Sequence, residues 1–163
     1  MLMALFFSAL VRAEADSETC DYEKLITTDL PFTLYVCAEG IDKEVSQAVQ
    51  FWNSKKESFI ISYNRDNCSA EQNWGSVRIK FDNAEVAEMN TEKSTAYGVT
   101  QRSHFINDMI IYSTVYLSTE TEKDELTILL THELGHALGY GHVEKDCIDH
   151  IMHPIISKMG RKF

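Results

Sequence analysis

One stretch of eleven residues constrains the fold and chemistry of this chain more than any other: His132-Glu133-Leu134-Gly135-His136-Ala137-Leu138-Gly139-Tyr140-Gly141-His142. Its first five residues follow the H-E-x-x-H pattern, which on a helix places two imidazoles one turn apart on one face, beside a carboxylate. Gly139 stands where such a helix should end, because a residue without a Cβ adopts a left-handed backbone at low cost. His142 then supplies a third nitrogen, and three neutral imidazoles leave the fourth position of a tetrahedral Zn²⁺ to water. We therefore expect a catalytic zinc site with His132, His136 and His142 as ligands.

Chance is a poor explanation for this string. H-E-x-x-H alone would occur in roughly 2% of shuffled sequences, but the full H-E-x-x-H-x-x-G-x-x-H would occur in only about 3 in 100,000. A buried helix with ordinary core histidines is the structural alternative. It does not explain why three of the six histidines fall at ligand spacing.

Glu133 lies between the two helical ligands, and we expect it to be the general base. A zinc-bound water has a pKa lowered from about 15.7 towards about 7, so a carboxylate beside it can take the proton and return it to a leaving amine. This predicts a zinc-dependent endopeptidase. Two other classes stay open: a non-catalytic zinc-binding interaction module, and a zinc amidase or peptidase that acts on cell-wall or other non-protein peptides.

Length and charge narrow the class of protein further. At 163 residues, with 44% apolar residues, the chain is long enough for one domain with a proper core and too short for two. The net charge of −10 argues against nucleic acid or an anionic membrane as the partner. We expect a monomer whose partner is an extended peptide or protein substrate.

The N-terminus resembles an export signal. Residues 2–11 are apolar apart from Ser8, and Ala13 and Ala15 stand at cleavage-site spacing. This predicts a signal peptide over residues 1–15 and a mature domain over residues 16–163, secreted or periplasmic. A short N-terminal helix of the mature protein is the alternative. The apolar run is too short to cross a bilayer, which needs about 20 residues.

Four cysteines, an even number in an exported chain, suggest two disulfides with three possible connectivities. They are Cys20, Cys37, Cys68 and Cys147. Their spacing does not resemble a zinc knuckle, so the metal is assigned to the histidines.

Hydrophobic periodicity predicts a mixed α/β sheet. β-branched and alternating runs predict strands, and apolar residues at helical spacing predict a first helix. The zinc helix is apolar nearly all round, which indicates burial, and Thr121 is its expected start. The expected strands cover residues 32–36, 59–63, 77–81, 95–101 and 109–117, the helices cover 42–53 and 126–138, and a loop or short surface helix covers 82–94.

The eleven-residue string is also the zinc signature of the metzincin metallopeptidases. In addition, Ile151-Met152-His153-Pro154 is similar to the methionine-turn that follows the third histidine in that clan. The resemblance extends from Phe32 to about Ile156 and is strongest from His132 to Pro154. Within the clan the chain is most similar to a small matrixin. It lacks the glutamate and tyrosine that astacins carry at the places of Val143 and Pro154, and the serine that matrixins carry after the third histidine.

The resemblance implies a zincin-like fold: a twisted, mixed five-stranded sheet with an antiparallel edge strand, an active-site helix, and a small irregular C-terminal subdomain after Gly139. It implies that Met152 packs beneath the zinc without coordinating it. It further implies that the edge strand, through Tyr97, Gly98 and Val99, holds an extended substrate, although an ordinary strand is the alternative. Pro154, Ile155 and Ile156 would form the outer wall of a pocket for a bulky apolar residue after the cut bond.

The same resemblance bears on the cysteines and on other metals. It favours disulfides between Cys37 and Cys68 and between Cys20 and Cys147; a Cys20 thiolate that latches the zinc is the alternative. One zinc ion is expected. A second, structural zinc is not predicted, because only His104 and Asp108 stand where matrixins carry its several ligands, and His104 is expected to be a solvated loop residue. Calcium is not predicted either. His150 and His153 are expected to be solvated.

Overall fold

The computed structural model describes residues 20, 33–55, 62–64, 75–88, 96–106 and 109–155. Several predictions from the sequence therefore lie outside the described residues: the signal peptide over residues 1–15, most of the strand predicted at 59–63, and the roles of Cys68, Asp108 and Ile156. The described part has the mixed α/β class expected from the sequence. Its elements are β1 (Thr33–Val36), α1 (Asp42–Lys55), β2 (Ser62–Asn64), β3 (Ser76–Phe81), α2 (Asn83–Glu88), β4 (Gly98–Ile106), β5 (Met109–Leu117) and α3 (Lys123–Ala137).

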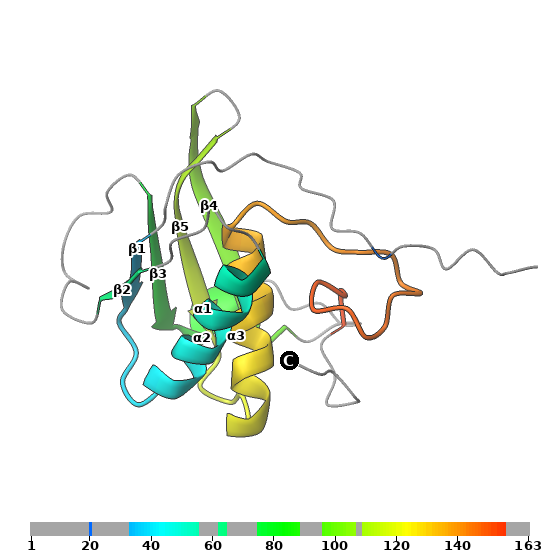
Figure 1. Cartoon of the computed structure of the whole chain (residues 1–163). Coiled ribbons are helices and arrows are strands. Elements are labelled where there is room, and N and C mark those ends of the chain that lie inside the picture. The colour runs from blue at the N-terminus through cyan, green and yellow to red at the C-terminus, as the bar shows by residue number, and fades with distance from the viewer. Residues whose placement is uncertain are drawn as a thin grey trace, which may run out of the picture.

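The strands form one sheet in the order β2-β1-β3-β5-β4 (Figure 1). The pairs β1–β2, β1–β3 and β3–β5 are parallel. Strand β4 lies at one edge and runs antiparallel to β5, with a register from Gly98 opposite Leu117 to Ile106 opposite Met109. A parallel sheet needs its faces covered, which explains why β5 is a continuous apolar and β-branched run.

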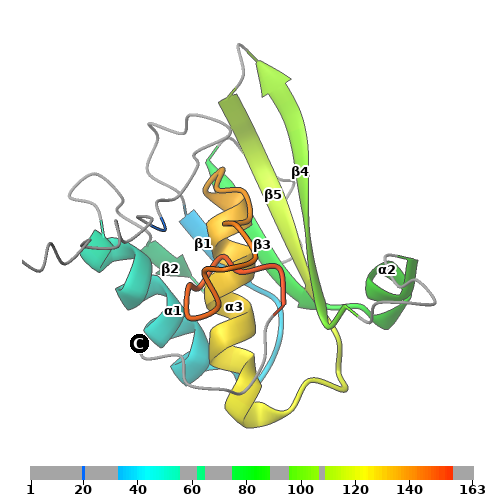
Figure 2. The ribbon, with the colours of Figure 1, turned by 90° about the vertical axis from the view of Figure 1, so that its right-hand side faces the viewer.

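Helices α1 and α3 lie side by side against one face of the sheet, as both views show (Figures 1 and 2). Apolar side chains of the sheet and of both helices meet there in a single core. Helix α3 is buried along most of its length, as its sequence predicts. Within the described ranges, no helix is long and apolar enough to span a membrane.

Trp52 joins α1 to α3 at the level of the H-E-x-x-H string. Its indole Nε1–H donates to the carbonyl oxygen of Thr131 at 2.7 Å, and its ring stacks on that of Tyr140, with centroids 5.1 Å apart. A Cβ on Gly135 would lie 2.6 Å from Cζ2 of Trp52 and would also collide with Sδ of Met152. The absent side chain of Gly135 therefore lets a tryptophan and a methionine pack directly on the α3 backbone.

Gly139 ends α3 in a left-handed conformation, with φ of 93°. Its N–H donates to the carbonyl of His136, and the N–H of Tyr140 donates to the carbonyl of Gly135, each at 3.0 Å. These two bonds make a Schellman motif, which satisfies the last carbonyls of a helix and reverses the chain. Residues 140–155, which form turns without a helix or strand, consequently loop out from this end of α3 (Figure 1) and return to the helix at Ile151 and Met152.

Two local predictions are wrong. The N-cap of α3 is Glu122 rather than Thr121. The N–H of Thr121 donates to the carbonyl of Ser118 in a turn, and the carbonyl of Glu122 accepts the first hydrogen bonds of the helix. His104 belongs to β4 rather than to a loop. The strand predicted at 95–101 begins at Gly98 and continues to Ile106 because β5 offers pairing partners along that whole length.

Candidate metal centre

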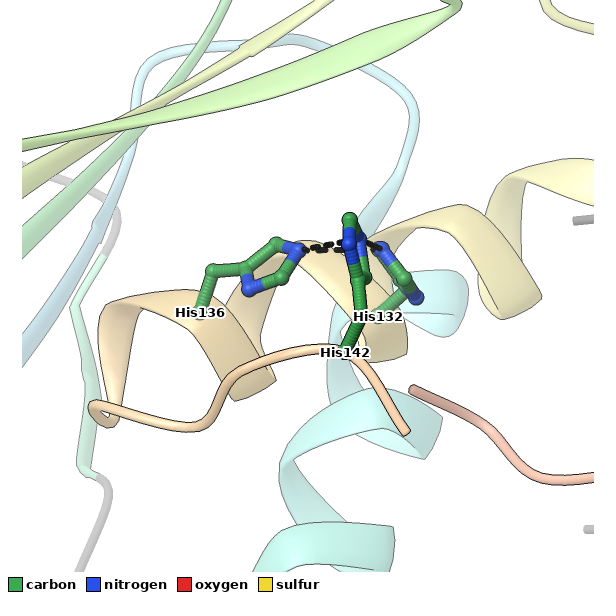
Figure 3. A group of neighbouring side chains, drawn as sticks. All are labelled: His132, His136 and His142. Atoms are coloured by element: carbon green, nitrogen blue, oxygen red, sulfur yellow. Dashed lines mark hydrogen bonds between the residues drawn. The ribbon is translucent and has the colours of Figure 1, made fainter. Parts of the chain in front are cut away.

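Three imidazoles converge beside the C-terminal end of α3. The helix supplies His132 and His136, and the reversed chain after Gly139 brings His142 towards them (Figure 3). The Nε2 atoms of His136 and His132 are 3.1 Å apart, those of His136 and His142 3.1 Å, and those of His142 and His132 3.3 Å. These three residues form the one cluster in the described ranges able to hold a metal ion. The structure thus brings the three predicted ligands together.

Backbone carbonyls determine which nitrogen of two of these rings carries the proton. Nδ1 of His132 lies 2.7 Å from the carbonyl oxygen of Ile151, and Nδ1 of His136 lies 2.9 Å from that of Tyr140. A carbonyl oxygen only accepts, so each Nδ1 must be the donor. In a neutral ring the Nε2 then carries a lone pair and no proton, which is the form that binds a metal.

This donor set fits a zinc ion. Two unprotonated Nε2 atoms cannot hydrogen-bond each other, so the close approach of His132 and His136 is unfavourable unless a cation lies between the lone pairs. A tetrahedral zinc with Zn–N distances of about 2.0–2.1 Å has nitrogen atoms about 3.3–3.4 Å apart. The observed spacings of 3.1–3.3 Å agree with that edge length to within a few tenths of an ångström.

Burial keeps the rings of His136 and His142 neutral. Burial lowers the pKa of His136 from 6.5 to about 4; the hydrogen bond to the Tyr140 carbonyl raises it, and the charges of His142 and Arg102 lower it further. The pKa of His142 is also lowered, first by the partial burial of its ring and then by the charge of His153. Neutral imidazoles at pH 7 are ready to bind a metal without first losing a proton.

Glu133 is buried between α3 and the edge strand, with 4% of its surface exposed. The hydroxyl of Thr100, on β4, donates to its Oε2 at 2.7 Å. Burial raises the pKa of Glu133 from 4.5 to about 7, although the Thr100 hydrogen bond lowers it. A carboxyl group with a pKa near 7 can both accept and release a proton at neutral pH.

The segment around Met152 supports the ligands. Met152 is fully buried, and its carbonyl accepts from the N–H of Val143, next to the third histidine, at 3.0 Å. The prediction that His153 is solvated is wrong, because the residue is buried and only 6% of its surface is exposed. Its Nε2 lies 3.0 Å from the carbonyl oxygen of Lys145, and its Nδ1 lies 3.1 Å from the N–H of Ile155. His153 therefore links two turns of residues 140–155.

The predicted substrate-binding residues lie at different depths. Tyr97 is 44% exposed and Ile155 65% exposed, Pro154 is exposed, and Val99 is partly buried. Gly98 packs against Glu133: a Cβ there would lie 3.0 Å from Oε1 of that residue. Sequence reasoning missed Thr100, although the two-residue period of a strand places it on the same face as Gly98.

Cys20 and Cys147 form a disulfide, with Cα atoms 5.8 Å apart. This is one of the two pairings that the resemblance favours, and it rules out the alternative in which the Cys20 thiolate latches the zinc. Cys37 is also disulfide-bonded. Its expected partner, Cys68, lies outside the described residues.

A protein-family model matches most of the chain. The sequence model of the matrixin family matches residues 32–163 of the chain, which include every described strand and helix. The chain matches no curated protein.

Proposed function

Because the chain belongs to the matrixin family, a family of zinc-dependent metallopeptidases, we propose that it is a secreted endopeptidase whose zinc is held by His132, His136 and His142. The observation that carries this proposal is the convergence of the three Nε2 atoms at the spacing of a tetrahedral zinc site. Three protein ligands leave a coordination position for water, which distinguishes a catalytic zinc from a structural one. One zinc ion per monomer is proposed.

A bound zinc ion would acidify a water molecule and polarise the scissile carbonyl. Glu133 would be the general base: its carboxylate would accept a proton from the attacking water and would later deliver that proton to the leaving amine. The buried position that raises its pKa to about 7 suits both transfers. The carbonyls of Ile151 and Tyr140 keep His132 and His136 in the tautomer that presents Nε2. Met152 packs beneath the ligands without coordinating.

Strand β4 holds the substrate. Its pairing with β5 uses one edge, and no other described strand pairs with the opposite edge. An extended peptide can add there through main-chain hydrogen bonds, which give affinity without demanding a particular sequence. Tyr97, Gly98 and Val99 are the proposed substrate contacts, and of these Gly98 packs against Glu133. Pro154, Ile155 and Ile156 would line the pocket for the residue after the cut bond, so the enzyme should prefer a bulky apolar residue there.

The proposed location is outside the cytoplasm. Matrixins are generally extracellular proteins, and the disulfide between Cys20 and Cys147 is of the kind that persists in an oxidising compartment. This agrees with the signal peptide expected over residues 1–15 and a catalytic domain over residues 16–163.

A peptide-library digest with mass-spectrometric readout tests the proposal. We expect cleavage before bulky apolar residues, complete inhibition by a zinc chelator, and recovery on adding zinc. Glu133→Gln should bind zinc normally but turn over several orders of magnitude more slowly, whereas Glu144→Gln, at an exposed position, should match wild type.

Three results of the digest would contradict the proposal. Activity that survives the chelator would exclude zinc chemistry. Stoichiometric zinc without cleavage of any amide would indicate a binding module. Cleavage limited to cell-wall peptides would indicate an amidase.

A further inference from the structure

The edge strand β4 contacts Glu133, the candidate base, through the side chain of Thr100. The hydroxyl of Thr100 lies 2.7 Å from Oε2 of Glu133 and 2.9 Å from the backbone carbonyl oxygen of the same residue. A threonine hydroxyl has one proton, so it can donate to only one of these acceptors at a time. When Glu133 is ionised, the carboxylate is the stronger acceptor. The two carboxylate oxygens therefore differ, because Oε2 accepts the Thr100 hydrogen bond and Oε1 does not.

Gly98 completes the contact from the same face of β4. A Cβ at this position would lie 2.9 Å from Cδ1 of Leu129, 3.0 Å from Oε1 of Glu133 and 3.1 Å from its Cγ. The glutamate side chain thus packs against bare backbone at Gly98 and is hydrogen-bonded at Thr100. Two residues further along, Arg102 is close enough for its charge to act on His136. Three alternate residues of one strand consequently face the H-E-x-x-H helix.

We propose that Thr100 is a positioning residue for Glu133: it holds Oε2 and leaves Oε1 as the oxygen that exchanges protons. This inference rests on the proposed peptidase function, in which Glu133 is the base. A glutamate side chain has several rotatable bonds, and fixing them before the reaction removes an entropic cost from the barrier. Burial of Glu133 restricts the side chain, and among the described residues the Thr100 hydroxyl is the hydrogen-bond donor that selects one carboxylate oxygen.

The kinetic test compares two substitutions at one position. Thr100→Val keeps the β-branched shape and removes the hydroxyl, while Thr100→Ser keeps the hydroxyl and removes a methyl group. We expect Thr100→Val to lower kcat at least tenfold with KM and zinc content unchanged, and Thr100→Ser to remain within about threefold of wild type. Thr127→Val, which removes a half-buried α3 hydroxyl that donates to Gln47, is the control and should leave kcat unchanged.

Three kinetic outcomes would overturn the assignment. Equal losses in Thr100→Val and Thr100→Ser would show that shape, rather than the hydroxyl, matters. A change confined to KM would make Thr100 a substrate contact. An unchanged kcat in Thr100→Val would remove the role altogether.

A second measurement does not depend on activity. Unfolding of the zinc-free protein in urea is measured for Thr100→Val, Glu133→Ala and the double variant. If the hydrogen bond couples the two residues, Thr100→Val should change the unfolding equilibrium constant at least fivefold in the wild-type background and much less in the Glu133→Ala background. Additive effects would show that the two side chains are independent and would overturn the inference. If wild type cleaved no peptide, the proposed function would fail, and this cycle would still decide whether Thr100 holds Glu133.

Discussion

The imidazole of His132 is tied to the backbone of Ile151, since its Nδ1 lies 2.7 Å from that carbonyl oxygen. The two residues are nineteen positions apart, one on α3 and the other next to Met152. Residues 140–155 therefore supply more than His142, the third proposed ligand: they also set the tautomer and orientation of His132. Changes in this segment should alter metal binding even where they touch no ligand.

Removing the third ligand tests the metal centre directly. His142→Ala should weaken zinc binding by at least 100-fold, because two imidazoles replace three, and it should leave the zinc-free stability within about 0.5 kcal/mol of wild type, because His142 is exposed. Zinc at 100 times its Kd should stabilise wild type by about 2.7 kcal/mol. Thermal unfolding with and without zinc measures both effects. A full zinc-induced rise in the Tm of His142→Ala would contradict the assignment.

The stability of the zinc-free protein should depend on pH through two opposing groups. The pKa of His136 is about 4 in the folded state and 6.5 when unfolded, so the unfolded state binds the extra proton and stability rises from pH 4 to 6.5. The pKa of Glu133 is about 7 folded and 4.5 unfolded, so stability falls from pH 4.5 to 7. The two trends nearly cancel in wild type.

The variant Glu133→Gln should reveal the contribution of His136 to the pH dependence of stability. Urea unfolding of this variant in the presence of a chelator should show stability rising by about 2–3 kcal/mol between pH 4.5 and 6.5. The lowered pKa of His142 adds to the same trend. His136→Gln should show a much smaller rise or a fall. Identical pH profiles for the two variants would show that these groups do not titrate as described.

Gly135→Ala should damage both stability and metal binding. The added Cβ meets Trp52 and Met152, and such overpacking typically costs about 1–3 kcal/mol. Displacing Met152 should also shift the neighbouring Ile151 carbonyl from His132 and so weaken zinc binding. Gly40→Ala is the matched control: its Cβ meets nothing, and only the strain of φ 75° remains, about 1–2 kcal/mol. Equal zinc affinities in the two variants would argue against coupling through Met152.

The disulfide between Cys20 and Cys147 should contribute strongly to stability. It closes a loop with a sequence separation of 127 residues, for which the chain-entropy estimate is about 5 kcal/mol. The double variant Cys20→Ser, Cys147→Ser should therefore unfold at markedly lower urea concentration. Reductant is a poorer test, because Cys37 is disulfide-bonded as well. An unchanged urea midpoint would contradict this prediction and would show that the unfolded chain between residues 20 and 147 is constrained even without this disulfide.

What the sequence could predict is mostly local. His132 and His136 meet because they are one helical turn apart, and His142 joins them because Gly139 reverses the chain within three residues; both follow from short-range geometry. The burial of α3 followed in the same way from apolar residues around its whole surface.

What could not be predicted depends on contacts between distant segments. The extension of β4 past Gln101 requires β5 as a partner. The burial of His153 requires residues 140–155 to fold on themselves. Thr100 and Glu133 are 33 positions apart, and no pattern within either segment indicates that they touch. The start of α3 was missed by a single residue, because Thr121 and Glu122 are both polar and compete for the N-cap.

The contact between β4 and α3 also has a consequence for inhibition. A compound that bound between β4 and α3 and moved the strand away from the helix would separate the Thr100 hydroxyl from Glu133. It would leave the three imidazoles in place. In the proposed mechanism, such a compound would impair proton transfer by Glu133 without binding the metal. Because Thr100 lies on β4 and outside the eleven-residue histidine string, this contact offers a route to selectivity among enzymes that share the same metal ligands.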